Sequence, residues 1–296
     1  MIGRLFVMLT GLFAVGSACV ASPPLENLLI GNHDSRFDKL AASIMRNTHS
    51  HYDRKENCWT MEGNTDECWR PVSLNAPAAG ASGKRKPFYY LLAVDVMEGA
   101  SAKMFVVEHL KTGGIYFHGV KTAKSHGGHI SIEDNGFGRN GFVQVGRELY
   151  GWKIHEDPPW ADANGGDSYY VFPARHTSSV YQSRIRKMGE AFTVYTDYIS
   201  TKLDEGMPIS RVNDYVGRTG LDSSNPEAEI YPLKITYKGI LDGVKACGGC
   251  EVTGGRKLPE QTCIAHADPK TLQYRIPDSC PMKVSGTGSA SRTSAN

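Results

Sequence analysis

The fold class follows first from the run Phe88-Tyr-Tyr-Leu-Leu-Ala-Val-Asp-Val96. Its aromatic and branched side chains are typical of a strand. Met-Phe-Val-Val at 104–107 predicts a second strand, and Lys-Thr-Gly-Gly at 111–114 has the composition of a turn. Ile-Tyr-Phe at 115–117 is then expected to be the return strand. Strands that follow one another through short turns predict an antiparallel sheet.

The same pattern continues along the chain. Residues 142–145 and 148–154 predict a tight hairpin, and residues 169–172 and 192–198 predict two further strands. Leu233, Ile235 and Tyr237 alternate with polar residues, which indicates a half-buried strand. Between the strands, the segment 178–190 is expected to form a short helix.

A second helix is predicted near the N-terminus. Ser35 and Asp38 have the spacing of a capping box, and apolar residues then recur on one helical face: Phe37, Leu40, Ala41, Ile44 and Met45. We expect a helix over 35–47. The predicted fold class is therefore α+β, with a β-rich body of short antiparallel strands, one N-terminal helix and a disulfide-stapled C-terminal segment.

Composition changes along the chain suggest how it is divided. A tract of small residues at 75–83 is typical of a linker. It separates a predicted N-terminal helix and disulfide loop (25–75) from a β-rich main domain (84–245). A cysteine-rich segment (246–284) follows, and the Ser- and Thr-rich tail at 285–296 is predicted to be disordered.

The first residues predict export. Arg4 precedes an apolar run from Leu5 to Val15, and small residues from Gly16 to Ala21 follow, which is the pattern of a signal peptide over 1–21. Cleavage is expected after Ala21 or after Ala18. An alternative is lipid anchoring at Cys19. No later segment is long and apolar enough to cross a membrane, so the mature chain is expected to be secreted or periplasmic.

The overall composition limits the class of protein. The chain has 296 residues, of which 40% are hydrophobic, so it can build a core and is not globally disordered. Its 33 basic and 31 acidic residues give a net charge of +2. That balance gives no indication of nucleic acid as a partner.

Six cysteines remain after the predicted leader, and an even number in an exported chain indicates disulfides. Cys58 and Cys68 are expected to pair. Three interpretations exist for the other four, Cys247, Cys250, Cys263 and Cys280: a redox-active Cys-x-x-Cys pair, a four-cysteine zinc site, or two structural disulfides. The exported context favours the third interpretation. The sequence leaves the pairing of these four open.

A histidine cluster is the richest candidate for chemistry. His126, His129, Glu133 and His155 offer the nitrogen and oxygen ligands of a possible zinc site. If 130–133 is a strand, then His129 and Glu133 lie on the same face of it. Glu133, Glu156 and Asp157 are the candidate carboxylates for general-base catalysis.

The spacing from His126 to Glu133, with Trp152 and His155 later, loosely resembles the zinc ligands of peptidoglycan-cleaving D,D-peptidases. Those enzymes carry Asp where this chain has Glu133, and Gly where it has His129, so family membership is not inferred. Two functions follow from the sequence. The first is an exported, non-enzymatic binding protein whose partner is an envelope polymer or another secreted protein. The alternative is a metal-dependent hydrolase that acts on an envelope polymer such as peptidoglycan.

Overall fold

The computed structural model describes residues 25–28, 35–49, 51–61, 64–77, 88–97, 99–109, 112, 114–125, 128–131, 141–157, 164–173, 184–247 and 249–280. Within them lie one helix and sixteen strands, arranged in two antiparallel sheets. The predicted leader with Cys19, and the predicted tail at 285–296, lie outside these residues. No helix in the described segments is long and apolar enough to span a membrane.

The first sheet has the strand order β2-β3-β4-β5-β6-β7, and β1 pairs with β4. Its strands are β1 (Leu25–Leu28), β2 (His51–Asp53), β3 (Cys58–Met61), β4 (Asn64–Pro77), β5 (Phe88–Asp95), β6 (Ser101–His109) and β7 (Ile115–Lys124). The predicted strands at 88–96, 104–107 and 115–117 are confirmed as parts of β5, β6 and β7. Because β4 pairs with β5, this sheet draws strands from both sides of the 75–83 tract.

The position of β5 between two cores explains why residues 88–96 are apolar without alternation. Tyr90 and Leu92 point into a core shared with the second sheet, whereas Leu91 and Ala93 point to the opposite face. That opposite face is covered by α1 (Ser35–Thr48) through Ala41, Ile44 and Met45, as the capping box and the apolar spacing predict. A strand buried on both faces reads as a continuous apolar run.

The second sheet has the order β16-β15-β14-β13-β12-β11-β10-β8, and β9 pairs with β10. Its strands are β8 (Ile130–Ser131), β9 (Phe142–Gly146), β10 (Leu149–Glu156), β11 (Gly165–Pro173), β12 (Arg186–Asp204), β13 (Met207–Leu221), β14 (Leu233–Lys245), β15 (Arg256–Ala267) and β16 (Tyr274–Arg275). The hairpin predicted over 142–154 is confirmed as β9–β10. The expectation of short strands is wrong here, because β12 has 19 residues and β13 has 15.

The helix expected at 178–190 is also wrong over the part that the structure describes. Residues 186–190 begin β12, where Lys187 pairs with Tyr170 of β11. Gly189 has a φ of 143°, a conformation that glycine adopts readily and that no helix contains. A register shift beside it leaves Met188 fully buried in the core. The segment therefore gains strand pairing and apolar burial that a helix would not provide.

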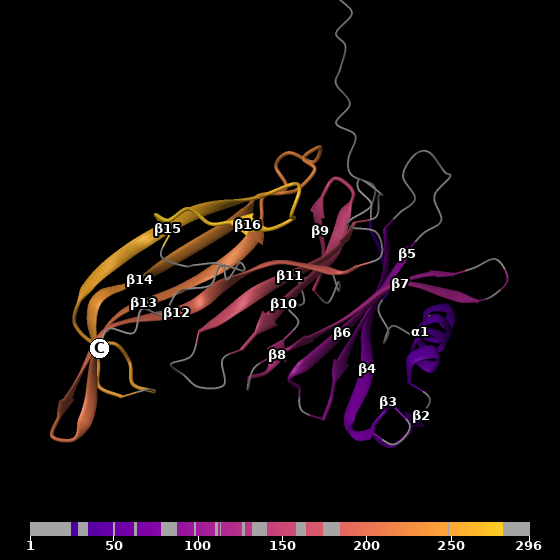
Figure 1. Ribbon diagram of the computed structural model, residues 1–296, viewed down its shortest axis with the longest axis horizontal. Helices are drawn as coiled ribbons and strands as arrows, with labels where there is room; N and C mark the ends of the chain where they lie inside the picture. Colours follow the sequence, from indigo (N-terminus) through magenta and orange to yellow (C-terminus); the bar gives the residue numbers. More distant parts are fainter. Residues whose placement is uncertain are drawn as a thin grey trace, which may run out of the picture.

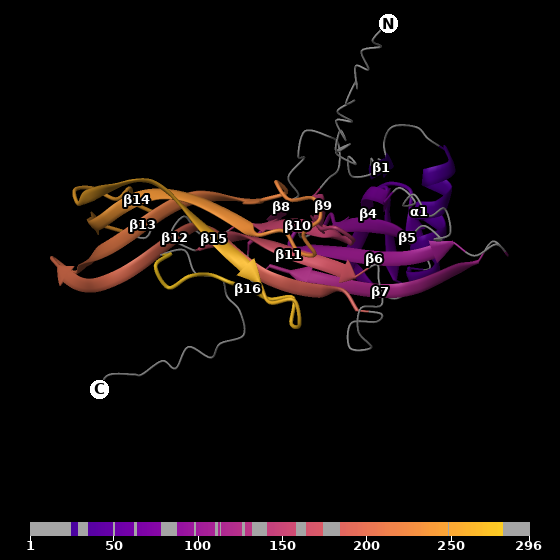
Figure 2. The same cartoon turned by 90° about the horizontal axis from the view of Figure 1, so that it is seen from above.

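The two sheets pack face to face through Trp152, Ile154, Tyr170 and Phe172 of the second sheet. The other face of the second sheet carries a separate core, to which Leu272, Tyr274 and Cys280 of the C-terminal segment contribute. Figures 1 and 2 show an elongated molecule, with α1 and the first sheet at one end and the long strands β12–β15 reaching the other. We call the face of the second sheet that carries Trp152 and Tyr170 its inner face.

The structure settles the cysteine pairing that the sequence left open. Disulfides join Cys58 to Cys68, Cys247 to Cys250, and Cys263 to Cys280. The last of these ties the chain after β16 back to β15. Because each sulfur is bonded to another sulfur, none is a thiolate available to bind zinc in this state.

Candidate functional site

The predicted histidine cluster is only partly within the described residues. His126 and Glu133 lie outside them, whereas His129, His155, Glu156 and Asp157 are described. Strand β8 places Ser131 opposite His155, and the Asp157 amide donates to the His129 carbonyl at 2.8 Å. Cross-strand partners share a face, and so do alternate residues. His129 and His155 therefore lie on the same face of neighbouring strands.

Both ring nitrogens of His155 contact carboxylates. Nδ1 lies 2.7 Å from Oδ1 of Asp167, the residue opposite it on β11, and Nε2 lies 3.2 Å from Oδ1 of Asp157. A metal ion at His155 would have to displace one of these contacts. Among the described residues, no group of three or more His, Cys, Asp or Glu side chains is placed to hold a metal ion.

Asp167 is the centre of this network and is 1% exposed. Lys153 Nζ lies 3.1 Å from its Oδ2, and the Thr219 hydroxyl, which bonds to Tyr169 at 2.9 Å, also donates to Asp167. Burial acts to raise the pKa of Asp167, but the hydrogen bond from His155, the charge of Lys153 and the bond from Thr219 bring that pKa below its ordinary value. The buried, ionised carboxylate of Asp167 therefore links β10, β11 and β13.

The remaining candidate acid, Glu156, lies on the other face of β10. It accepts a hydrogen bond from the Ser168 hydroxyl at 3.3 Å, and Lys187 lies 4.0 Å away. Adjacent residues of a strand point to opposite faces, so Glu156 and Asp157 do not form one catalytic pair. The described part of the cluster thus consists of two ion networks on opposite faces of a sheet.

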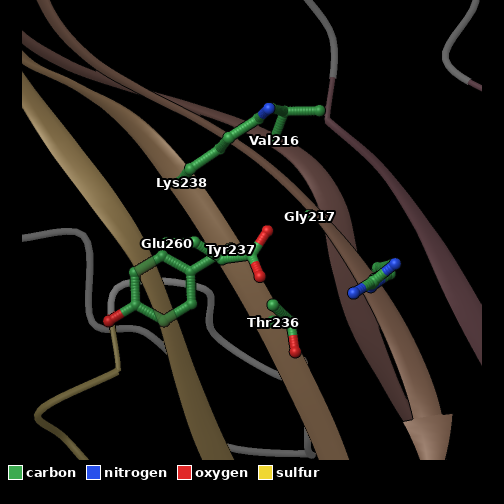
Figure 3. Close-up of a pocket in the computed structure, with 7 residues that line it drawn as sticks. Val216, Gly217, Thr236, Tyr237, Lys238 and Glu260 are labelled. Carbon is green, nitrogen blue, oxygen red and sulfur yellow. The ribbon is translucent and has the colours of Figure 1, made fainter.

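A hollow of about 160 Å³ lies elsewhere, on the inner face of β13–β15 (Figure 3). It is lined by Val216, Gly217, Arg218, Thr236, Tyr237, Lys238 and Glu260. Arg218 pairs with Thr236, and Val216 pairs with Lys238, so these four side chains share one face. Tyr237 points to the opposite face, where it is buried in the core and its hydroxyl donates to Gln261 at 2.9 Å.

The hollow carries two cations and one carboxylate, so its side chains give it a net positive charge. Arg218 and Lys238 are exposed, and no ion pair or hydrogen bond within the described segments involves either side chain. Glu260 contributes one carboxylate beside them, and the hydroxyl of Thr236 lies 3.3 Å from that of Thr262. Three hydrogen-bonded strands hold these donors and the Glu260 acceptor in place, so the hollow can bind an anionic or hydroxyl-rich group without rearrangement of the backbone.

In comparisons with known proteins, no protein family, no curated protein and no solved structure matches this chain. The sequence did not lead us to predict this hollow, although one pattern in it indicates a polar sheet face. The alternation that predicted a half-buried strand at 233–237 also implies a polar face, made by Lys234, Thr236 and Lys238. The sheet register that brings Arg218 and Glu260 beside them is not visible in the sequence.

Proposed function

We propose that this chain is an exported, non-enzymatic binding protein that holds an anionic polymer of the cell envelope in the hollow on β13–β15. The observation that carries the proposal is the pair of exposed cations, Arg218 and Lys238, which flank the hollow without a carboxylate bonded to either. A guanidinium presents paired donors that match a carboxylate or a phosphate. An ammonium beside it adds a second positive charge for the same ligand.

The shape of the site favours an extended ligand over a small enclosed one. Sites for small molecules are mostly concave and apolar, and they bury most of the ligand. This hollow instead lies on an open sheet face, and its lining includes the polar side chains of Arg218, Thr236, Lys238 and Glu260. A polymer can cross such a face, place one anionic group between Arg218 and Lys238, and bond its hydroxyls to Thr236 and Glu260.

Export is supported by two independent features. The N-terminal sequence has the pattern of a signal peptide, and three disulfides join the six later cysteines. Disulfides persist in oxidising compartments and are rare in the cytosol. A disulfide-stapled protein in the envelope would meet anionic polymers there at high local concentration.

Co-sedimentation with purified cell-wall sacculi tests the proposal. We expect wild-type protein to bind and R218A/K238A to bind roughly thirtyfold more weakly, since each exposed charged contact contributes about 1 kcal/mol. K39A/R54A removes two exposed cations from the other end of the chain and is the matched control, expected to bind like wild type. Equal binding by R218A/K238A would contradict the proposal.

Two further measurements on the sacculi identify the anionic group of the ligand and test the alternative function. Treatment of the sacculi with hydrofluoric acid removes phosphodiester-linked polymers, so lost binding assigns the ligand to phosphate and retained binding assigns it to carboxylate. Release of soluble fragments by wild-type protein with added zinc would instead support the hydrolase alternative that the sequence raised.

A further inference from the structure

The hairpin formed by β12 and β13 projects beyond its neighbours in the second sheet. Strand β11 pairs with β12 only as far as Val194, and β14 pairs with β13 only from Ser210 onwards. The two strands continue to pair with one another up to Asp204 and Met207. Figure 1 shows the result as a narrow finger at the lower left. Residues 197–208 are exposed on both of its faces.

The tip of this finger combines apolar and acidic side chains. Leu203 is 77% exposed and Met207 is 68% exposed. Between them, Asp204 and Glu205 lead into the turn at Gly206, where Glu205 and Gly206 have φ angles of 48° and 80°. Within the described residues, neither acid takes part in an ion pair or a side-chain hydrogen bond. With Lys202, which is also exposed, the tip therefore presents two apolar side chains and a net negative charge.

The tip is complementary to the hollow described above. The two acids match the two unpaired cations Arg218 and Lys238, and Val216, which is 46% exposed, offers an apolar contact for Leu203. The tip cannot reach the hollow of its own chain, because both lie on the continuous strand β13. Met207, at the start of β13, and Val216 are nine residues apart on it, which is about 30 Å in an extended strand.

We propose that two copies of this chain associate about a two-fold axis, with the acidic tip of each hairpin docked in the hollow of the other. Each copy supplies one tip and one hollow, so two equal contacts form and the assembly closes as a dimer. This proposal rests on the hollow of the proposed function. In the dimer, the hairpin tip of the other copy occupies that hollow. The hairpin then competes with the anionic polymer, and polymer binding releases monomers.

Reciprocal charge reversal tests this arrangement by sedimentation velocity in the absence of polymer. D204K/E205K gives a chain with a basic tip and a basic hollow, whereas R218E/K238E gives an acidic tip and an acidic hollow. We expect each variant alone to dimerise at least roughly tenfold more weakly than wild type, because like charges then face each other. An equimolar mixture of the two variants is expected to recover the dimer, since both contacts are again between opposite charges.

Matched controls change the same net charge elsewhere. E229K/D278K and K39E/R54E alter exposed residues away from the tip and the hollow, and both are expected to dimerise like wild type. Wild-type protein that stays monomeric, a species larger than a dimer, or variants that dimerise as well as wild type would each overturn the proposal. So would a mixture that fails to recover the dimer when both variants retain the wild-type circular dichroism spectrum.

The polymer assay separates this inference from the proposed function. D204K/E205K keeps an intact hollow and is expected to bind sacculi at least as tightly as wild type. If wild-type protein is monomeric but binds sacculi through Arg218 and Lys238, only the self-docking fails. If it dimerises as described but does not bind sacculi, only the proposed function fails.

Discussion

His49 provides a sharp test of the packing between α1 and the first sheet. It follows the last turn of the helix and is 2% exposed. Its Nδ1 lies 2.7 Å from the Thr48 hydroxyl, and its Nε2 lies 3.0 Å from Nζ of Lys103. Lys103 in turn lies 3.9 Å above the ring of Trp69. Since the ammonium of Lys103 can only donate, the histidine must be neutral to accept its hydrogen bond.

Burial, and next the charge of Lys103, lower the pKa of His49 from 6.5 to about 4. The unfolded chain therefore takes up a proton on this residue near pH 6.5, whereas the folded protein does so only near pH 4. Between these values the unfolded state binds more protons, so the free energy of unfolding falls as the pH falls. Between pH 7.5 and pH 5.0 this linkage amounts to about 2 kcal/mol.

Urea unfolding at pH 7.5 and pH 5.0 measures this loss directly. We expect wild-type protein to lose about 2 kcal/mol more stability over this interval than His49→Gln, which keeps an acceptor for Lys103 but does not titrate. His51→Gln removes an exposed histidine two residues away and is the control, expected to follow wild type. If wild type and His49→Gln lose the same stability, then His49 is not held neutral by its surroundings.

Three further predictions concern the second sheet. Asp167→Asn is expected to destabilise the protein by about 3 kcal/mol at pH 7, because it leaves the surrounding cation and histidine without their buried carboxylate. The difference should shrink as the pH falls below the ordinary carboxyl pKa of about 3.9, because the unfolded wild-type chain then takes up a proton before the folded protein, whose Asp167 pKa is lower, does. Urea unfolding across pH checks both. Serine in place of both Cys263 and Cys280 should cost about 3 kcal/mol and open the C-terminal segment to protease, which limited proteolysis measures. Gly151→Ala would place a methyl carbon 1.8 Å from the carbonyl oxygen of Tyr170, so the thermal midpoint should fall by more than 10 °C, whereas Gly220→Ala, with open space at that position, should shift it far less.

Local patterns predicted the elements whose neighbours in sequence are also their neighbours in space. The capping box at Ser35 located α1 to within one residue of its end, and the turn between Val145 and Leu149 predicted the β9–β10 hairpin. The pairing of Cys58 with Cys68 followed from their proximity in the chain. In each case the signal is carried by residues a few positions apart.

The rest depends on contacts between distant segments. The start of β12 looks helical in isolation, and it becomes a strand because β11 offers it pairing and the core accepts Met188. Likewise, the partner that fixes His155 is Asp167, which only the register of β10 against β11 reveals. The hollow needs β13, β14 and β15 in register before Arg218, Lys238 and Glu260 come together, and no short motif records that arrangement.

Chemical-shift mapping by NMR locates the bound polymer on the protein residue by residue. Soluble fragments released from sacculi would be added to the monomeric D204K/E205K variant, in which the hollow is free of a second copy. We predict that the shifted backbone amides cluster at 216–218, 236–238 and 260, and that they stay unperturbed when R218A/K238A is added to the same chain. Shifts that cluster around His155 instead, or binding that persists without Arg218 and Lys238, would contradict the assignment of the hollow as the binding site.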